Sequence, residues 1–434
     1  MMGKYRKILI GILLLTLIII SACGSNSPDA PKQVTLKILV DYADGFNNQF
    51  STMFKIKHPH IELEVVELPF DFNATREQQA KQRMEFIDEQ RPDLVVFENP
   101  QDYQRAAREG KLLELDIHIK NSEYKLEQIS HIVENLKSES DGKIYGLAPF
   151  FDTSVLYYNA DLFQQFGIDP PQHKMTWEEL IQLAKRFPTE GSDTDRIFGI
   201  TGFYGPVDLF SQIGAAKGLS LFDTKEQQLF LNSEEWKNVY NITIDAIKSN
   251  TINSKPPGES IEDMFEEGRA AMKIDSASLS GQLELSRKSR KKFEWGFVTI
   301  PTSEAYPNSS AQIQPTDITS IHAASQHVDE AWTYIQFVNS DEYAKANSNY
   351  ASLTIPTLPQ SINKQDTTRS ATYYMLKAGR EGRSAVWKNW LYPFHTTFSE
   401  LFNTQTQQVL EGKITTDEAL HQIQAEGKKL LMKK

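Results

Sequence analysis

The chain has 434 residues, more than one hydrophobic core usually holds, so we expect two structural units. Charged residues make up 24% and hydrophobic residues 40% of the chain, as in ordinary soluble globular proteins. The formal net charge of -11 excludes the basic character that nucleic-acid binding requires, so no nucleic-acid partner is expected.

The N-terminus has the three parts of an export signal. A basic start at residues 4–7 precedes an apolar run at 8–20, and two small residues then lead to Cys23. The run is short for a helix that crosses a bilayer, which needs about 20 residues. We therefore predict a signal peptide over 1–22. The polar, proline-containing stretch 23–33 is typical of a flexible tether.

Strands and helices alternate in the next segment. β-branched and apolar runs predict strands, and polar stretches bounded by turn residues predict the helices between them. Strand, helix and strand in this order favour a parallel α/β sheet with right-handed crossovers. The predicted elements are strand 34–40, helix 46–57, strand 61–68, helix 73–89 and strand 93–97, followed by a helix after Pro100.

The rest of the chain is richer in helices. Thr176 and Thr415 each stand three residues before a Glu, the spacing of a capping box that starts a helix. A further helix is predicted at 328–338 from its apolar stripe. Strands are predicted at 155–158, at "AAMKID" (270–275) and at "WGFVTI" (295–300).

The motifs of several enzyme classes are absent from the sequence. There is no P-loop, GxGxxG, GxSxG, HExxH or CxxC motif, so no catalytic residue and no cofactor is predicted. His58 and His60 flank a proline in a turn, and Asp193 and Asp195 lack the full calcium-loop pattern, so no metal site is predicted. An enzyme that acts on polysaccharides remains an alternative, because carboxylate separation cannot be read from the sequence.

Five segments resemble, in order, the extracellular solute-binding proteins of ABC importers, in particular the family (family 1) that carries sugars and oligosaccharides. Ahead of them, Ile20-Ser21-Ala22-Cys23 resembles the lipobox of bacterial lipoproteins. The segments are "DGKIYGLAPFFDTSVLYYNADLF" (141–163), "TWEEL" (176–180), "FEEGRAAMKIDS" (265–276), "WGFVTIP" (295–301) and "VLEGKITTDEAL" (409–420).

The resemblance implies a two-lobed α/β fold of the periplasmic-binding-protein type (type II). Each lobe would be a sheet flanked by helices, with the ligand in a cleft between the lobes. The chain would cross between lobes over 147–152, near Ile300 and near Ile355-Pro356. Lobe one would comprise 34–149 and 301–357, and lobe two 150–300 and 358–434.

The implied function is binding and delivery, not catalysis. The protein would be a lipid-anchored monomer on the extracellular face of the cell membrane, with the lipid, including palmitate, on Cys23. It would capture a carbohydrate, expected to be an oligosaccharide, by hinge closure and deliver it to the transmembrane subunits of an ABC permease. An alternative keeps the binding role with a non-sugar or acidic solute, such as a peptide, a polyamine or a uronate-type acid.

The resemblance also suggests ligand-binding residues at strand ends and near the first crossing. Aromatic rings would pack on sugar C–H faces, and carboxylates would accept hydrogen bonds from hydroxyls. Many relatives have Gly-x-Trp after the "AAM" strand, where this chain has Asp275-Ser276-Ala277-Ser278. The implied residues are Asp44, Glu98, Asn99, Asp152, Phe203, Tyr204 and Trp390.

Overall fold

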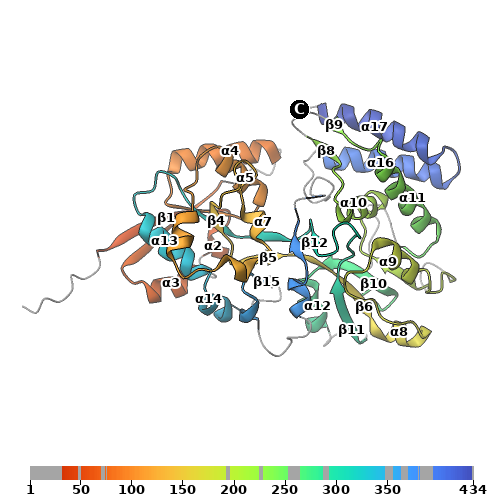
Figure 1. Ribbon diagram of the computed structural model, residues 1–434, viewed down its shortest axis with the longest axis horizontal. Helices are drawn as coiled ribbons and strands as arrows, with labels where there is room; N and C mark the ends of the chain where they lie inside the picture. The colour runs from red at the N-terminus through yellow and green to blue at the C-terminus, as the bar shows by residue number, and fades with distance from the viewer. Residues whose placement is uncertain are drawn as a thin grey trace, which may run out of the picture.

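The computed structural model divides the described chain into two lobes joined by extended segments (Figure 1). The N-terminal strands and helices lie in the left lobe of the figure, here called lobe one, and the C-terminal helices lie in the right lobe, lobe two. None of the helices within the described ranges is long and apolar enough to cross a membrane. The structure describes residues 32–46, 50–69, 74, 76–191, 196–223, 228–252, 264–286, 293–347, 355–362, 370–379, 381 and 394–432.

Lobe one contains a five-stranded mixed sheet in the order β2-β1-β3-β14-β4. β1 runs parallel to β2 and β3, whereas β14 is antiparallel to both β3 and β4. The three strands predicted in the first hundred residues are confirmed to within one residue at each end. The strands are β1 (Val34–Val40), β2 (Ile61–Glu67), β3 (Leu94–Phe97), β4 (Gly146–Leu147) and β14 (Ile318–Ile321).

Helices surround this sheet. The helix predicted over 46–57 is confirmed from Thr52 to Lys57, and a short helix over Ala43–Phe46 precedes it. Residues 47–49 lie outside the described residues. The helices are α2 (Ala43–Phe46), α3 (Thr52–Lys57), α4 (Arg76–Gln90), α5 (Pro100–Arg108), α6 (Asp116–Asn121), η2 (Leu126–Ile129), α7 (Val133–Leu136), α13 (Val328–Val338) and α14 (Asp341–Ala346).

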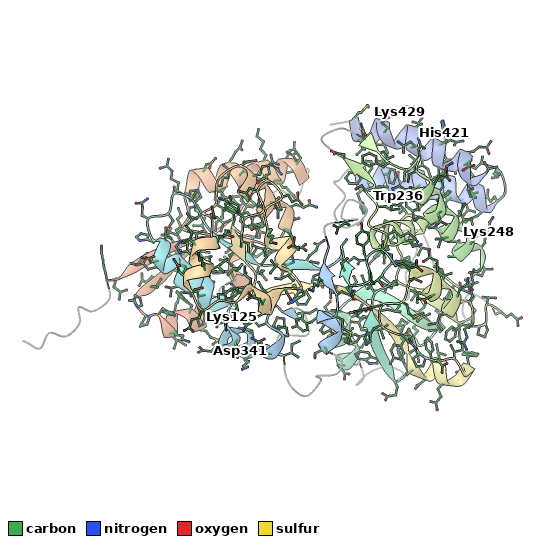
Figure 2. All side chains as sticks on the ribbon, in the orientation of Figure 1. Lys125, Trp236, Lys248, Asp341, His421 and Lys429 are labelled. Carbon is green, nitrogen blue, oxygen red and sulfur yellow. The ribbon has the colours of Figure 1, made fainter. Side chains whose placement is uncertain are left out.

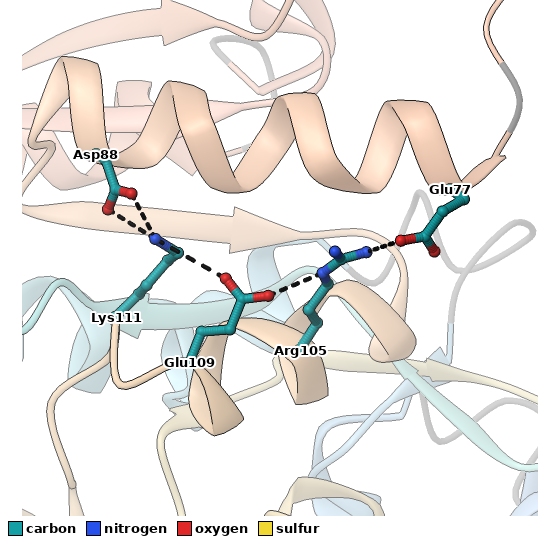
Figure 3. A network of polar contacts seen from close by, with 5 residues as sticks. All are labelled: Glu77, Asp88, Arg105, Glu109 and Lys111. Atoms are coloured by element: carbon teal, nitrogen blue, oxygen red, sulfur yellow. Dashed lines mark hydrogen bonds and ion pairs between the residues drawn. The ribbon is translucent and has the colours of Figure 1, made fainter. Parts of the chain in front are cut away.

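A chain of ion pairs connects α4 with α5 and the loop that follows it (Figure 3). Arg105 contacts Glu77 and Glu109, each at 2.9 Å. Lys111 contacts Asp88 at 2.6 Å and Glu109 at 3.9 Å. Alternating charges therefore hold these helices side by side on the surface of lobe one, where each pair contributes about 1 kcal/mol or less.

Lobe two contains a four-stranded sheet in the order β11-β6-β10-β7. β6 is antiparallel to β10 and β11, and β10 is parallel to β7. The strands predicted around 155–158, 270–275 and 295–300 are confirmed. The strands are β6 (Ser154–Asn159), β7 (Phe198–Thr201), β10 (Ala270–Ser276) and β11 (Trp295–Thr299), with a separate hairpin of β8 (Phe222–Asp223) and β9 (Gln228–Leu229).

The C-terminal helices pack within lobe two (Figure 1). The ring of Phe210 lies 4.6 Å from that of Trp236 and 4.7 Å from that of Phe402, between centroids. Trp236 is buried inside the lobe, whereas His421 and Lys429 lie on its outer side (Figure 2). The helices are α8 (Ala160–Phe166), α9 (Trp177–Ala184), α10 (Pro206–Ala216), α11 (Glu234–Lys248), α12 (Leu279–Ser286), α16 (Phe394–Leu410) and α17 (Thr416–Met432).

Both predicted capping boxes are confirmed. Thr176 Oγ1 accepts from the backbone N–H of Glu179 at 3.2 Å, and Glu179 Oε2 accepts from the N–H of Thr176 at 2.8 Å. Thr415 and Glu418 make the same pair of bonds at 3.2 and 2.8 Å. These local bonds define where α9 and α17 begin.

A third sheet lies between the lobes and consists of β5 (Phe150–Asp152), β13 (Gln314–Thr316) and β15 (Ile355–Pro356) in the order β13-β5-β15. Both outer strands are antiparallel to β5. We propose that these strands are the three crossings between lobes. The second crossing then lies at β13 and not near Ile300, because Thr302 still donates to Met175 O of lobe two at 2.8 Å.

Further short elements lie near the strands of the middle sheet in the chain. β12 (Ser309–Ser310) pairs with β16 (Lys377–Ala378), and the 3-10 helices η4 (Pro359–Ser361) and η6 (Thr372–Tyr374) lie nearby in the chain. Tyr374 donates to Pro356 O at 2.6 Å, and its neighbour Tyr373 stacks on Phe297 of β11 at 5.1 Å. Two adjacent residues of η6 thus contact different parts of the molecule: Tyr374 contacts β15, and Tyr373 contacts β11 of lobe two.

Candidate ligand-binding site

The carboxyl ends of β1 and β3 meet at one edge of the lobe-one sheet. From β1 the chain passes to β2 on one side, while β3 pairs with the other side of β1. The connection after β1 therefore leads to one side of this strand and the connection before β3 leads to its other side. Open α/β sheets usually bind their ligands where the connections go to opposite sides in this way. Asp41 follows β1 directly, and Glu98 follows β3 directly.

A third carboxylate reaches the same edge from β14. Ile318 is paired with Phe97, so the residue before Ile318 lies beside the residue after Phe97. Asp317 therefore lies next to Glu98. Its φ of 55° is in the left-handed region, which Asp and Asn adopt more readily than most residues. We call Asp41, Glu98 and Asp317 the carboxylate cluster.

Arg83 on α4 lies behind this cluster. Its guanidinium is ion-paired with Asp41 and, through Nε at 3.4 Å, with Asp102 on α5. The side chains of Arg83 and Asp102 are only 6% and 4% exposed, so this charge is compensated inside the lobe. The remaining nitrogen, Nη1, has no hydrogen-bond partner among the described residues.

Neighbouring carboxylates raise the pKa values of Glu98 and Asp317. Burial and the Asp41 carboxylate raise the pKa of Glu98, and the Arg83 guanidinium partly opposes this shift. Burial and the Glu98 carboxylate raise the pKa of Asp317 to about 7, with a smaller effect from Asp41. Like charges that lie close together and lose water disfavour ionisation, so both groups keep their protons to a higher pH than a free carboxyl group.

The residues predicted in lobe one lie at or near this edge. Glu98 is a member of the cluster. Asp44 is exposed in the first turn of α2, shortly after Asp41. Asn99 is the N-cap of α5, where its Oδ1 accepts from the N–H of Gln101 at 2.7 Å. That bond gives the Asn99 side chain a structural role in starting the helix.

Asp152 lies at the end of β5, where the first crossing enters lobe two. Its Oδ1 accepts from Ser276 Oγ at 3.0 Å, and Ser276 Oγ lies 3.0 Å from Ser278 Oγ. This hydrogen-bonded turn occupies the position where the family resemblance implied a stacking ring. The predicted polar replacement therefore takes the form of a small serine cluster linked to Asp152.

The two aromatic residues predicted after β7 have different surroundings. Phe203 is 5% exposed and packs on Trp177 at 6.1 Å between ring centroids, so it belongs to the core of lobe two. Tyr204 is 52% exposed and is the better candidate for a contact with a ligand. Trp390 and the predicted lipidation site Cys23 lie outside the described residues.

The sequence reasoning missed Asp41, Asp317 and Arg83. Asp41 could have been predicted from the sequence, because it directly follows a strongly predicted strand at a position where α/β sheets place ligand contacts. Asp317 could not have been predicted, because no pattern in the sequence near it indicates that β14 pairs with β3. Arg83 stands in a polar helix, and its burial depends on the packing of α4 against α5.

The model of the family described as bacterial extracellular solute-binding protein matches residues 37–345. The mannitol-binding protein of Pseudomonas aeruginosa is 27% identical over 213 residues, which is 47% of this chain and 47% of that protein. The multiple sugar-binding protein of Streptococcus mutans is 23% identical over 241 residues, 51% of each chain. The matched segments thus span about half the length of these two relatives.

Solved structures confirm the predicted two-lobed α/β fold. A sugar transporter from Rhizobium etli in an open conformation has a TM-score of 0.69 at 21% identity, covering 91% of this chain and 99% of that one. The sugar-binding protein MalE of Xanthomonas citri has a TM-score of 0.66 at 15% identity, and the match covers 92% of this chain and 98% of that one. At these identities the likeness concerns the fold.

Proposed function

Because this chain belongs to the bacterial extracellular solute-binding proteins, we propose that it captures a carbohydrate and delivers it to the membrane subunits of an ABC importer. The family consists of substrate-binding proteins and not enzymes, so the chain is assigned no catalytic residue. The names of two relatives, a mannitol-binding protein and a multiple sugar-binding protein, support a sugar or sugar alcohol as ligand.

The observation that carries this proposal is the carboxylate cluster at the switch point of lobe one. Ionised carboxylates accept strong hydrogen bonds from hydroxyl groups, which sugars carry on most of their carbons. Tyr42, beside Asp41, and Tyr204, after β7, are 55% and 52% exposed. Exposed rings at strand ends offer apolar faces to the C–H groups of a sugar.

The three crossing strands supply the hinge in this proposal. A ligand that contacts groups from both lobes has more contacts when the lobes are closed, so it shifts the equilibrium toward closure. The permease would then recognise the closed form. Residues of the middle sheet, such as Phe151 and Pro356, would absorb the change in backbone angles.

The cellular setting is a further part of the proposal. The lipobox-like residues 20–23 support cleavage before Cys23 and attachment of diacylglycerol and palmitate there. Two acyl chains hold a protein to a membrane, where one would not. The protein would then be a monomer anchored at the extracellular face of the cell membrane. Loss of membrane association in Cys23→Ser tests this part.

The binding role is tested by calorimetric titration of residues 23–434 carrying Cys23→Ser. The panel comprises mannitol, neutral mono- and oligosaccharides, uronates, short peptides and polyamines. Saturable binding of a neutral sugar or polyol without product formation supports the proposal. Binding of only the acidic, peptide or amine members overturns the carbohydrate assignment, and cleaved products would indicate an enzyme.

A pair of variants locates the binding site. Glu98→Gln removes one carboxylate of the cluster and is expected to weaken sugar binding about tenfold, because a hydrogen bond to a charged group contributes about 1.5–3 kcal/mol. Glu64→Gln removes the same charge from the exposed middle of β2 and should leave affinity unchanged. Equal affinities for both variants would exclude the cluster as the site.

A further inference from the structure

We propose that Arg83 is a positioning residue for ligand binding, because it fixes the direction of the Asp41 carboxylate at the carboxyl end of β1. The inference rests on the proposed function, since it concerns the same edge of lobe one. It is argued from the contacts of Arg83 with two strand ends, from the shape of the guanidinium group, and from the free-energy cost of burying charges.

Arg83 contacts the ends of two neighbouring strands. Its guanidinium is ion-paired with Asp41, which directly follows β1. It also lies over the ring of Phe97, the last residue of β3, with its Cζ 5.9 Å from the ring centroid. Through Nε, at 3.4 Å, it contacts Asp102 in the first turn of α5. One side chain of α4 thus joins the end of β1, the end of β3 and the helix that follows β3.

The shape of the guanidinium group suits this bridge. Its N–H groups point in fixed directions in one plane, so Nε and Nη2 can bind two different carboxylates at once. The ammonium group of lysine is a single charge at the end of a flexible chain and has no such fixed directions. The Asp41 side chain is 15% exposed, against 6% for Arg83 and 4% for Asp102, so it is the carboxylate of this pair that a ligand can reach.

Stability alone does not account for burying these charges. Buried ion pairs often stabilise a protein no more than apolar side chains of similar volume, because the charges lose their water. Nη1 of Arg83 also lacks a hydrogen-bond partner among the described residues, which adds to the cost. Arg105 already joins α5 to α4 at the surface, through Glu77 at 2.9 Å (Figure 3). What Arg83 adds to this connection is its contact with the end of β1.

The test measures ligand affinity and stability separately, in residues 23–434 carrying Cys23→Ser. Arg83→Lys keeps the positive charge but cannot bind both carboxylates in fixed directions. Calorimetric titrations use D-mannitol, D-glucose and maltotriose. The probe that the parent binds most tightly should bind about tenfold more weakly to Arg83→Lys, because a misdirected Asp41 loses charge-assisted hydrogen bonds. Arg105→Lys, at the surface between the same helices, is the matched control and should keep the parent affinity. Urea unfolding establishes that each variant is folded under the titration conditions.

A double-mutant cycle separates positioning from a purely structural role. If Arg83 acts through Asp41, Arg83→Lys should weaken binding no further in a protein that already carries Asp41→Asn. A structural role predicts instead that the two losses of binding free energy add. Asp102→Asn weakens the hold on the guanidinium and leaves both partners of the Asp41 ion pair in place. It should weaken binding about threefold, and it serves if Arg83→Lys does not fold.

The outcomes separate this inference from the proposed function. Parent affinity in folded Arg83→Lys, or in Asp102→Asn where that variant is used, overturns the inference and leaves carbohydrate binding in place. Additive losses in the cycle also overturn it. Equal losses in Arg83→Lys and Arg105→Lys overturn it as well, because the effect would then come from the contact between the two helices. No binding of any probe by the parent overturns both the inference and the proposed function.

Discussion

His131 is buried where lobe one meets the crossing strands. Its ring lies 4.9 Å from that of Phe151 on β5 and 5.0 Å from that of Tyr374 on η6, and its Nε2 has no hydrogen-bond partner in the part of the chain that the structure describes. Burial lowers the pKa of His131 to about 4, from an ordinary value of 6.5. The imidazole is therefore neutral in the folded protein at neutral pH.

Protonation of His131 should destabilise the protein in mild acid. The unfolded chain binds this proton more readily, so the contribution is complete above pH 6.5 and is lost as the pH falls toward 4. The difference corresponds to about 3 kcal/mol at most. Urea unfolding of His131→Phe should show a smaller loss of stability between pH 7 and pH 4.5 than the parent. His421→Phe, at an exposed position, should lose as much stability over this pH range as the parent protein. Equal losses in all three proteins would contradict the assignment of this pH dependence to His131.

At the scale of single elements, α9 depends on its first turn. The capping box of Thr176 and Glu179 satisfies two backbone N–H groups, and the helix buries Trp177 and Leu180 against lobe two. Helix starts of this kind were predictable, because the bonds join residues three apart. The ion pairs that Arg105 of α5 and Lys111 of the following loop make with α4 were not predictable, because they depend on how two helices lie together.

Loss of the α9 cap should be measurable. Thr176→Ala removes the acceptor for the Glu179 N–H and is expected to lower the free energy of unfolding by about 1 kcal/mol. Thr176→Ser keeps a hydroxyl at the same position and should retain most of that stability. Urea denaturation of the two variants provides the comparison, and coincident midpoints would show that the cap contributes nothing.

At the scale of the whole molecule, neither lobe is a continuous piece of chain. β14 follows the second crossing, yet it lies between β3 and β4 in the lobe-one sheet, and all four of its residues are buried. In lobe two, the C-terminal helices pack on α10 through Phe402 and Phe210. Each lobe is therefore complete only after the chain has crossed between them.

A fragment that ends at Pro149 should not fold cooperatively. It contains β1 to β4 but lacks β14, so β3 and β4 lose the strand that pairs with both. Residues 23–149 with Cys23→Ser should show no cooperative urea transition by circular dichroism. The same fragment joined by a flexible linker to residues 313–347 regains β14 and α13 and should show one. A cooperative transition of the shorter fragment would mean that lobe one does not require β14.

The sequence by itself determined the family, the two-lobed fold and most strands and capped helices. These follow from short-range features: alternation along a strand, cap residues three apart, and motifs in a fixed order. Tertiary structure alone decided which carboxylates meet. Asp317 lies beside Glu98 only because β14 pairs antiparallel with β3, and Phe203 is excluded from the ligand contacts we propose because it is buried in the core, where it contacts Trp177. Such contacts join residues far apart in the chain, where no local pattern records the pairing.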